Sequence, residues 1–308
     1  MNRKKIEYTF KSKDTEEFLD VLFYRPFGYI MALAAKKMGI TPNQVTIFSI
    51  FVGILAGHLF FYNNIYINII GILLLIWAEA LDSTDGQLAR ITNHRSRFGR
   101  ILDGFAGNLW FLSIYIHLTL RYILLGGSPW IIFFVIFAAM SHSFQSAIAD
   151  YYRNFYLFFV LGNNKSEIDK SENIYQEYKQ LFWSKNFIKK FLLNIYLTYT
   201  KEQELFSYKL RKLFKYTLEH YNGEMPQPFK DEYRRLSKPL VKYYNILTTN
   251  TRMIVLFIAL FLNSFEIYLA FEITILNFLF IYVVNKQEKI SDVMLNYAKI
   301  RPQLSYSP

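Results

Sequence analysis

Six apolar runs constrain this chain more than any other feature, because each is near the roughly 20 residues that a membrane-spanning helix needs. They lie at about 44–62, 66–85, 103–124, 129–150, 250–265 and 267–285. Hydrophobic residues make up 53% of the 308 residues, whereas a water-soluble domain has about 45–50%. Lipid offers exposed backbone groups no partners, so such runs form helices. The sequence therefore predicts an all-α, polytopic membrane protein with about six transmembrane helices. The run 250–265 is the shortest, and the alternative for it is a buried or re-entrant helix.

Basic residues are unevenly distributed over the connections between the runs. The connections 62–66, 126–129 and 263–266 contain no Lys or Arg, and most basic residues follow the opposite ends of the runs. Lys and Arg are in excess on cytoplasmic loops, so we expect both termini and the stretch 82–107 to lie in the cytoplasm. The same bias explains the net charge of +11, and no nucleic-acid partner is expected. The chain has no cysteine, which excludes disulfides, thiol catalysis and cysteine-bound metals.

The positions of the runs divide the chain into segments. We expect a cytoplasmic or interfacial N-terminal segment (1–40), four spans (41–160), a cytoplasmic helical insertion (161–249), two further spans (250–289) and a polar tail (290–308).

Several of these segments carry local helix signals. Residues 20–37 form an amphipathic pattern, and a position at the membrane surface is expected for them. Thr41 followed by Pro42 suits an N-cap and the first helical position. The insertion has helical periodicity over 174–218, with lysines between the apolar positions. This pattern fits either a small cytoplasmic helical domain or a basic amphipathic helix on anionic lipid.

Three carboxylates lie where the second and third apolar runs meet water. Residues three or four apart share a helix face, so Asp82 and Asp85 form one stripe and Asp103 belongs to a second. If the two helices pack side by side, the three side chains converge. Oxygen ligands suit a hard cation such as Mg²⁺ or Mn²⁺, and Mg²⁺ tends to share its shell with substrate phosphates. Ionisable groups at this depth are costly and usually functional.

Small residues and one arginine accompany the carboxylates. Gly86, Ala89 and Arg90 continue the first stripe, and Gly99 belongs to the second. The small residues leave room beside the backbone for a bulky ligand, and Arg90 can form a charge-assisted bond to a phosphate. The stretch therefore predicts a site for a divalent cation together with a phosphate-bearing ligand.

These residues, in the pattern Asp-x2-Asp-Gly-x2-Ala-Arg-x8-Gly-x3-Asp, resemble the signature of the CDP-alcohol phosphotransferases. This family, also called the CDP-alcohol phosphatidyltransferases, consists of integral membrane enzymes of phospholipid synthesis. The resemblance covers roughly 40–160 and 250–285. It implies transfer of a substituted phosphate from a CDP-linked lipid or alcohol donor to an alcohol acceptor, with release of CMP. It also implies a homodimer.

The resemblance implies roles for the matching residues. Catalysis and binding of Mg²⁺ or Mn²⁺ would fall to Asp82, Asp85 and Asp103. The CDP site would be shaped by Gly86, Ala89, Arg90 and Gly99.

The chain departs from the family signature at its last position, where Gly107 replaces a fourth aspartate. In the family, that aspartate is held to bind a second metal and to accept the proton of the attacking alcohol, and glycine can do neither. Glu79 lies three residues before Asp82, on the same helix face, and is a candidate substitute base. Two interpretations stay open. The protein is either an active CDP-alcohol phosphotransferase or a catalytically impaired relative that binds CDP-donor and metal or acts as a partner or scaffold subunit.

Overall fold

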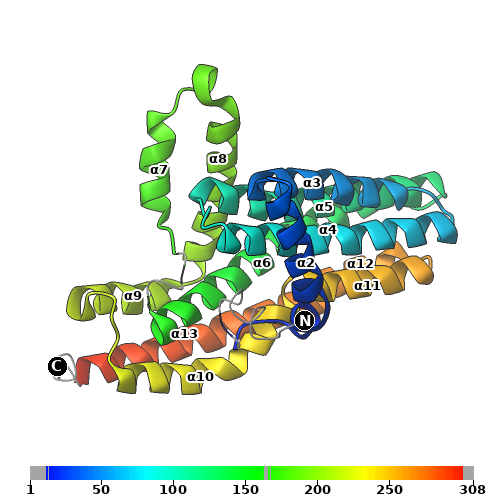
Figure 1. Cartoon of the computed structure of the whole chain (residues 1–308). Coiled ribbons are helices and arrows are strands. Elements are labelled where there is room, and N and C mark those ends of the chain that lie inside the picture. The colour runs from blue at the N-terminus through cyan, green and yellow to red at the C-terminus, as the bar shows by residue number, and fades with distance from the viewer. Residues whose placement is uncertain (1–11, 13, 163–165, 167, 301–308) are drawn as a thin grey trace. The chain divides into compact units, whose positions relative to one another are not determined.

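A computed structural model describes residues 12, 14–162, 166 and 168–300, and every regular element in this part of the chain is a helix (Figure 1). The described chain forms two compact units. The first contains Glu16–Met140 and Arg252–Ile273, and the second contains Ser141–Thr251, residues 274–300 and the short stretch that ends at Thr15. The boundaries at Met140, Thr251 and Ile273 lie within helices. The segment limits expected from the sequence stay a prediction.

In the described part of the chain, six helices are long and apolar enough to cross a membrane, which confirms the predicted all-α, polytopic fold class. They are Pro42–Leu59, Ile65–Ile91, Arg97–Leu124, Ile131–Leu161, Gln227–Phe261 and Phe265–Ile300. Several extend beyond the apolar runs that predict them, because their polar ends continue the helix on buried faces. The fifth joins α10 (Gln227–Ile246) to α11 (Thr249–Phe261), and the apolar part is α11.

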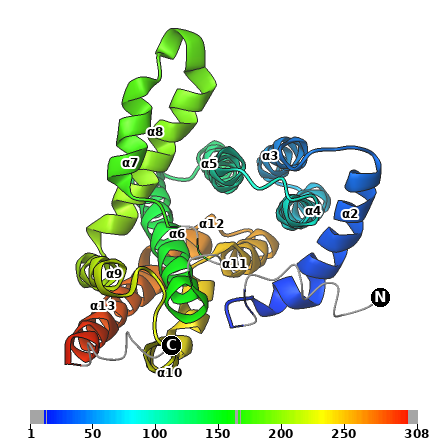
Figure 2. The same cartoon turned by 60° about the vertical axis from the view of Figure 1, so that its left-hand side comes forward.

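The first unit is built around α3 (Pro42–Leu59), α4 (Ile65–Ile91) and α5 (Arg97–Leu124), which lie side by side in Figures 1 and 2. Small residues allow this close approach. A Cβ on Gly53 of α3 would collide with the Trp110 ring of α5, and one on Gly71 of α4 would collide with Phe60. Helix packing in membranes relies on such small residues, so these glycines let α3 lie close to both α4 and α5.

Further helices complete this unit. Its N-terminal part is η1 (Asp20–Tyr24), a π-helix, followed by α2 (Arg25–Lys37), which packs on α4. The remainder is the first part of α6 (Ile131–Leu161), α11, α12 (Phe265–Ala270) and the π-helix η3 (Phe271–Ile275), which crosses the unit boundary. The helix expected over 20–37 is therefore present.

The predicted N-cap of the first span is confirmed. The Thr41 hydroxyl accepts a bond from the Gln44 N–H at 3.4 Å, and the Gln44 side chain accepts one from the Thr41 N–H at 2.8 Å. This reciprocal capping box satisfies two backbone donors at the start of α3.

The second unit contains the insertion, which is helical. Its elements are the rest of α6, α7 (Ser171–Gln180), α8 (Trp183–Leu205), α9 (Tyr208–Tyr221), α10 and α13 (Leu276–Ile300). Helix α13 packs on α9 and α10, and α7 pairs with α8 in a hairpin. The segment expected to be a polar tail continues α13 as far as Ile300. Ser291, Met294 and Ala298 of this segment are buried, because α13 packs on α9 and α10.

Candidate functional site

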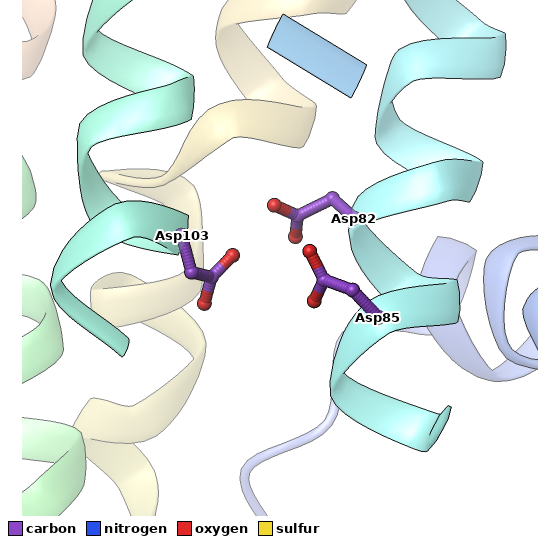
Figure 3. A group of neighbouring side chains, drawn as sticks. All are labelled: Asp82, Asp85 and Asp103. Atoms are coloured by element: carbon purple, nitrogen blue, oxygen red, sulfur yellow. The ribbon is translucent and has the colours of Figure 1, made fainter. Parts of the chain in front are cut away.

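The three carboxylates of the motif converge. Asp82 and Asp85 lie one turn apart on α4, Asp103 lies on α5, and each offers an oxygen within 4.8 Å of those of the other two. Figure 3 shows the three carboxyl groups directed toward one another between the two helices. Three like charges this close repel one another, and a divalent cation held between them removes the repulsion. The cluster has the charge and the oxygen donors that fit such an ion.

The helix ends place these side chains. Helix α4 continues past its apolar part to Ile91. The last turns of this helix carry Asp82 and Asp85. Ser96 caps the start of α5, where its hydroxyl accepts a bond from the Gly99 N–H at 2.9 Å. The cap sets the helical phase that directs Asp103 toward α4.

Thr46 of α3 is a residue that the motif does not contain. Its hydroxyl lies 2.5 Å from the Asp85 Oδ2 and donates to it, and both side chains are buried. A hydroxyl donor of this kind orients a carboxylate for a ligand, as second partners of metal ligands do. Its sequence signal is weak, because a threonine inside an apolar helix usually bonds to its own backbone.

Arg90 lies beside the acidic cluster, and one of its N–H donors is available to a ligand. Its guanidinium covers Gly86, where an added Cβ would lie 3.3 Å from Nη2. Its Nε–H is buried and has no hydrogen-bond partner among the described residues. A buried donor without a partner is costly, so this N–H is matched to an acceptor such as a phosphate oxygen. The arrangement fits the phosphate role predicted for Arg90.

A second arginine was not predicted from the sequence. Arg25, at the start of α2, is a charged neighbour of Arg90. It donates to the Glu16 carboxylate at 3.0 and 3.2 Å, and its backbone carbonyl accepts a bond from the Gln87 side chain at 3.0 Å. These bonds hold the N-terminal segment against α4 next to the motif. No sequence pattern links positions so far apart in the chain.

Gly99 marks another close approach. An added Cβ there would lie 3.0 Å from the Asn43 Oδ1, so the start of α3 borders the site at this point. Ala89 and Gly86 are half-buried on α4. Their roles in shaping a nucleotide site stay a prediction.

Glu79 and Gly107 bear on the missing fourth aspartate. Among the described residues, the close group consists of Asp82, Asp85 and Asp103, and Glu79 is not a member. The charged neighbours of Glu79 include Asp20 of η1 and Asp103. Gly107 is half-buried, and a Cβ added there would meet no atom within 4 Å. Space for a side chain therefore exists at 107, and the substitute role of Glu79 stays a prediction.

The fold and the cluster define a polytopic α-helical membrane protein with an acidic, cation-compatible site at the ends of two spans. Residues 39–154 match the model of the family described as CDP-alcohol phosphatidyltransferase. This match confirms, over residues 39–154, the resemblance seen in the motif.

Two curated proteins are similar to parts of this chain. An archaetidylinositol phosphate synthase of Pyrococcus horikoshii is 40% identical over 78 residues, which cover 25% of this chain and 40% of that protein. An uncharacterized protein of Aquifex aeolicus is 33% identical over 85 residues, which cover 26% of this chain and 42% of that protein. The chain thus spans about two fifths of the length of these relatives.

Proposed function

We propose that this protein is a membrane enzyme of phospholipid synthesis that transfers a substituted phosphate from a CDP-linked donor to an alcohol and releases CMP. The convergence of Asp82, Asp85 and Asp103 within 4.8 Å carries this proposal. The family match over residues 39–154 supports the same reaction class.

The three aspartates would hold Mg²⁺ or Mn²⁺. When bound, the metal supplies charge neutralisation on the diphosphate of the donor and on the leaving CMP. Thr46 keeps the Asp85 Oδ2 oriented through its hydroxyl. The unpartnered Nε–H of Arg90 would bind a phosphate oxygen of the donor. Gly86, Ala89 and Gly99 would leave space for the nucleotide beside the backbone of α4 and α5.

The proposal also covers the membrane orientation, the oligomeric state and the acceptor alcohol. We place the site and both termini on the cytoplasmic side, because Lys and Arg are in excess at those ends of the spans. A homodimer follows from the resemblance to the family. Inositol phosphate belongs in the panel of acceptor alcohols, since one relative is named an archaetidylinositol phosphate synthase.

CMP release tests the proposal directly. Purified protein is incubated with Mg²⁺, CDP-diacylglycerol and a panel of alcohols, and CMP is quantified. The Asp85→Asn variant removes one negative ligand while keeping the volume, and it should abolish release. Asp231→Asn changes an exposed residue of α10 far along the chain. It is the matched control and should leave release unchanged. CMP release by Asp85→Asn at the native rate would contradict the metal role of the cluster.

Gly107 favours a second candidate function, in which the protein binds CDP-donor and metal, or acts as a partner subunit, without efficient transfer. General-base catalysis contributes roughly 10²–10⁴-fold, and the glycine offers no base. A Cβ added at 107 meets no atom within 4 Å, so Gly107→Asp should raise the transfer rate by about that factor if the base is missing.

The control for this substitution is Asn108→Asp. It adds the same charge one residue further on, about 100° around the helix, where the Asn108 amide now donates to the Gly104 carbonyl at 2.9 Å. It should not raise the rate. If the native protein already transfers quickly and Gly107→Asp adds nothing, another group is the base, and Glu79→Gln is then the variant to measure.

A further inference from the structure

The hairpin of α7 and α8 carries large apolar side chains on the outside of its tip. In Figure 1 it extends away from α9, α10 and α13 of the same unit. Phe182, Phe187 and Ile188 are 69%, 64% and 67% exposed. Trp183 and Phe191 are also exposed. A contiguous group of large exposed apolar residues marks an interaction surface, whereas isolated ones do not.

The local chain produces this surface. Ile174 of α7 and Leu192 and Leu197 of α8 are buried, in contrast to the side chains of the tip. The backbone leaves helical geometry at Asn186, with φ −134° and ψ 37°, near the start of α8. Beyond this kink the rings of Phe187 and Phe191 stack at 6.3 Å, and the Trp183 ring lies 5.7 Å from Phe187. The aromatic side chains therefore form one continuous row that the hairpin does not bury.

Lysines surround this aromatic row. The stretch 175–191 contains Lys179, Lys185, Lys189 and Lys190 against one acid, Glu177.

The four lysines differ in their contacts and in their exposure to solvent. Lys190 lies inside the tip, where its Nζ donates to the Leu181 carbonyl at 2.6 Å and stands 5.4 Å from the centre of the Trp183 ring. Lys189 pairs with Glu177 at 3.2 Å. Lys179 and Lys185 are exposed to solvent. The tip thus presents apolar and aromatic area with net positive charge.

We propose that the tip of the α7–α8 hairpin, residues 179–191, is an anchor on the anionic surface of the membrane that holds the spans. Aromatic side chains favour the boundary between lipid and water. Exposed lysines are attracted to anionic headgroups. A surface that combines both features matches an interfacial lipid layer better than a protein partner, whose contact surface is usually depleted in Lys.

Chain connectivity places a membrane within reach. Helix α6, one of the candidate spans, ends at Leu161, and α7 begins at Ser171. Ten extended residues reach at most about 35 Å, so the base of the hairpin lies within that distance of the end of α6. This proposal is independent of the catalytic one, because it uses none of the residues of the acidic cluster.

The absence of cysteine makes a clean test possible. A Ser184→Cys variant of the full chain receives an environment-sensitive fluorophore at the tip. The protein is placed in nanodiscs of phosphatidylcholine alone or mixed with phosphatidylglycerol. We expect blue-shifted emission and quenching by spin-labelled lipid in the anionic discs, and weaker effects in the neutral ones. Adding Lys179→Gln and Lys185→Gln should lower the ratio of lipid-bound to free tip about five-fold per lysine.

A probe at Thr198→Cys is the matched control, since this exposed residue lies on the same helix outside the aromatic row. It should report water in both kinds of disc. Water-like emission from the Ser184→Cys probe in both discs would overturn the proposal. Apolar emission without quenching by spin-labelled lipid would also overturn it, because the tip would then be covered by protein, either a second copy or another partner.

Discussion

Asp85 is the most buried member of the acidic cluster, with 5% of its surface exposed, and Thr46 controls how it is oriented. The Thr46 hydroxyl has one hydrogen, and two acceptors lie within reach, the Asp85 Oδ2 at 2.5 Å and the Pro42 carbonyl at 3.1 Å. The carboxylate is the stronger acceptor because it is charged. A hydroxyl in this position fixes one carboxylate rotamer and leaves the other oxygen for a ligand.

Thr46→Val should therefore weaken Mg²⁺ binding while keeping the volume of the side chain. Loss of such a supporting hydrogen bond lowers metal affinity by roughly 10- to 100-fold. Calorimetric titration with Mg²⁺ in the presence of a CDP-donor measures the effect. Thr119→Val is the control, because that buried hydroxyl donates to the Tyr115 carbonyl within α5. Equal metal affinity of the two variants would show that Thr46 plays no part in the site.

The acidic cluster was predictable at the level of residues, and its supporting shell was not. Helical spacing places Asp82 and Asp85 on one face, and the small residues of the motif suggest that another helix approaches there. Thr46 and Arg25 reach the motif through the packing of α3 and α2, and no periodicity in the sequence encodes that contact. Whether the cluster binds metal stays a prediction.

Asp14 joins the N-terminal stretch to two helices of the second unit through hydrogen bonds and ion pairs. It accepts hydrogen bonds from the Tyr156 hydroxyl at 2.8 Å and from Arg234 and Lys238 at 2.7 and 2.9 Å. Burial acts to raise the pKa of Asp14. The hydrogen bonds from Lys238 and Tyr156 and the charge of Arg234 outweigh this effect, so the pKa lies below its ordinary value of 3.8. The interactions tie the N-terminal stretch to α6 and α10.

Asp14→Asn should lower the free energy of unfolding by about 1–2 kcal/mol at neutral pH, since two of the partners are half-exposed and screened by solvent. The folded-state pKa is depressed, so the stabilisation is complete well above pH 3.8 and is lost as the pH falls through the lower native value. Thermal unfolding in detergent over a pH series measures both effects. Asp231→Asn, which removes an exposed bond from Gln227, should change little. A difference between Asp14→Asn and the native protein that persists undiminished at pH well below 3.8 would refute the assignment.

At the scale of elements, apolar runs predict that spans exist but not where their helices end. Helices α4, α6 and α13 continue beyond the apolar runs, because polar side chains such as Gln287 find buried partners that only the tertiary fold supplies. The two π-helices of the described residues were also not predictable, since a single extra residue per turn leaves no mark in a hydrophobic pattern. Hydrophobic periodicity indicated that the insertion is helical. Where one helix ends and the next begins is set by tertiary packing, which produces α7, α8 and α9.

One of these π-helices, η3, carries a fully buried acid. Glu272 accepts a hydrogen bond from Arg252 of α11, and both side chains are 0% exposed. A buried pair is weak evidence for stability as such, because desolvation offsets the attraction. If one of the two side chains is removed, the other is left as an uncompensated charge among apolar helices. The pair therefore fixes which faces of α11 and η3 meet.

Glu272→Gln should lower the free energy of unfolding by about 3–5 kcal/mol, whereas Arg252→Met combined with Glu272→Leu should recover most of the loss. Thermal unfolding in detergent distinguishes the two variants. The control is Asp292→Asn, which breaks the half-exposed pair of Asp292 with Lys209 at 2.8 Å and should cost no more than about 1 kcal/mol. If the double variant is as unstable as the single one, side-chain shape rather than charge pairing dominates at this position.

At the scale of the whole molecule, the charge bias and the helix lengths together predict the orientation. Asp103 and Leu124 lie 21 residues apart on α5, a distance of about 32 Å that matches the hydrocarbon thickness of a bilayer. The connection after α5 should thus lie on the side opposite to the acidic cluster. If α6 crosses once, the insertion returns to the side of the cluster, where basic residues are concentrated.

Two single-cysteine variants test this orientation, because the native chain contains no cysteine. Ser128→Cys lies in the exposed connection between α5 and α6, and Glu219→Cys lies on an exposed face of α9 in the insertion. In sealed right-side-out vesicles, a membrane-impermeant maleimide should label Ser128→Cys at once and Glu219→Cys only after lysis. A trapped cytoplasmic marker protein confirms that the vesicles are sealed. The opposite labelling pattern would place the cluster of Asp82, Asp85 and Asp103 outside the cytoplasm, away from CDP-linked donors, and would contradict the proposed reaction together with the orientation.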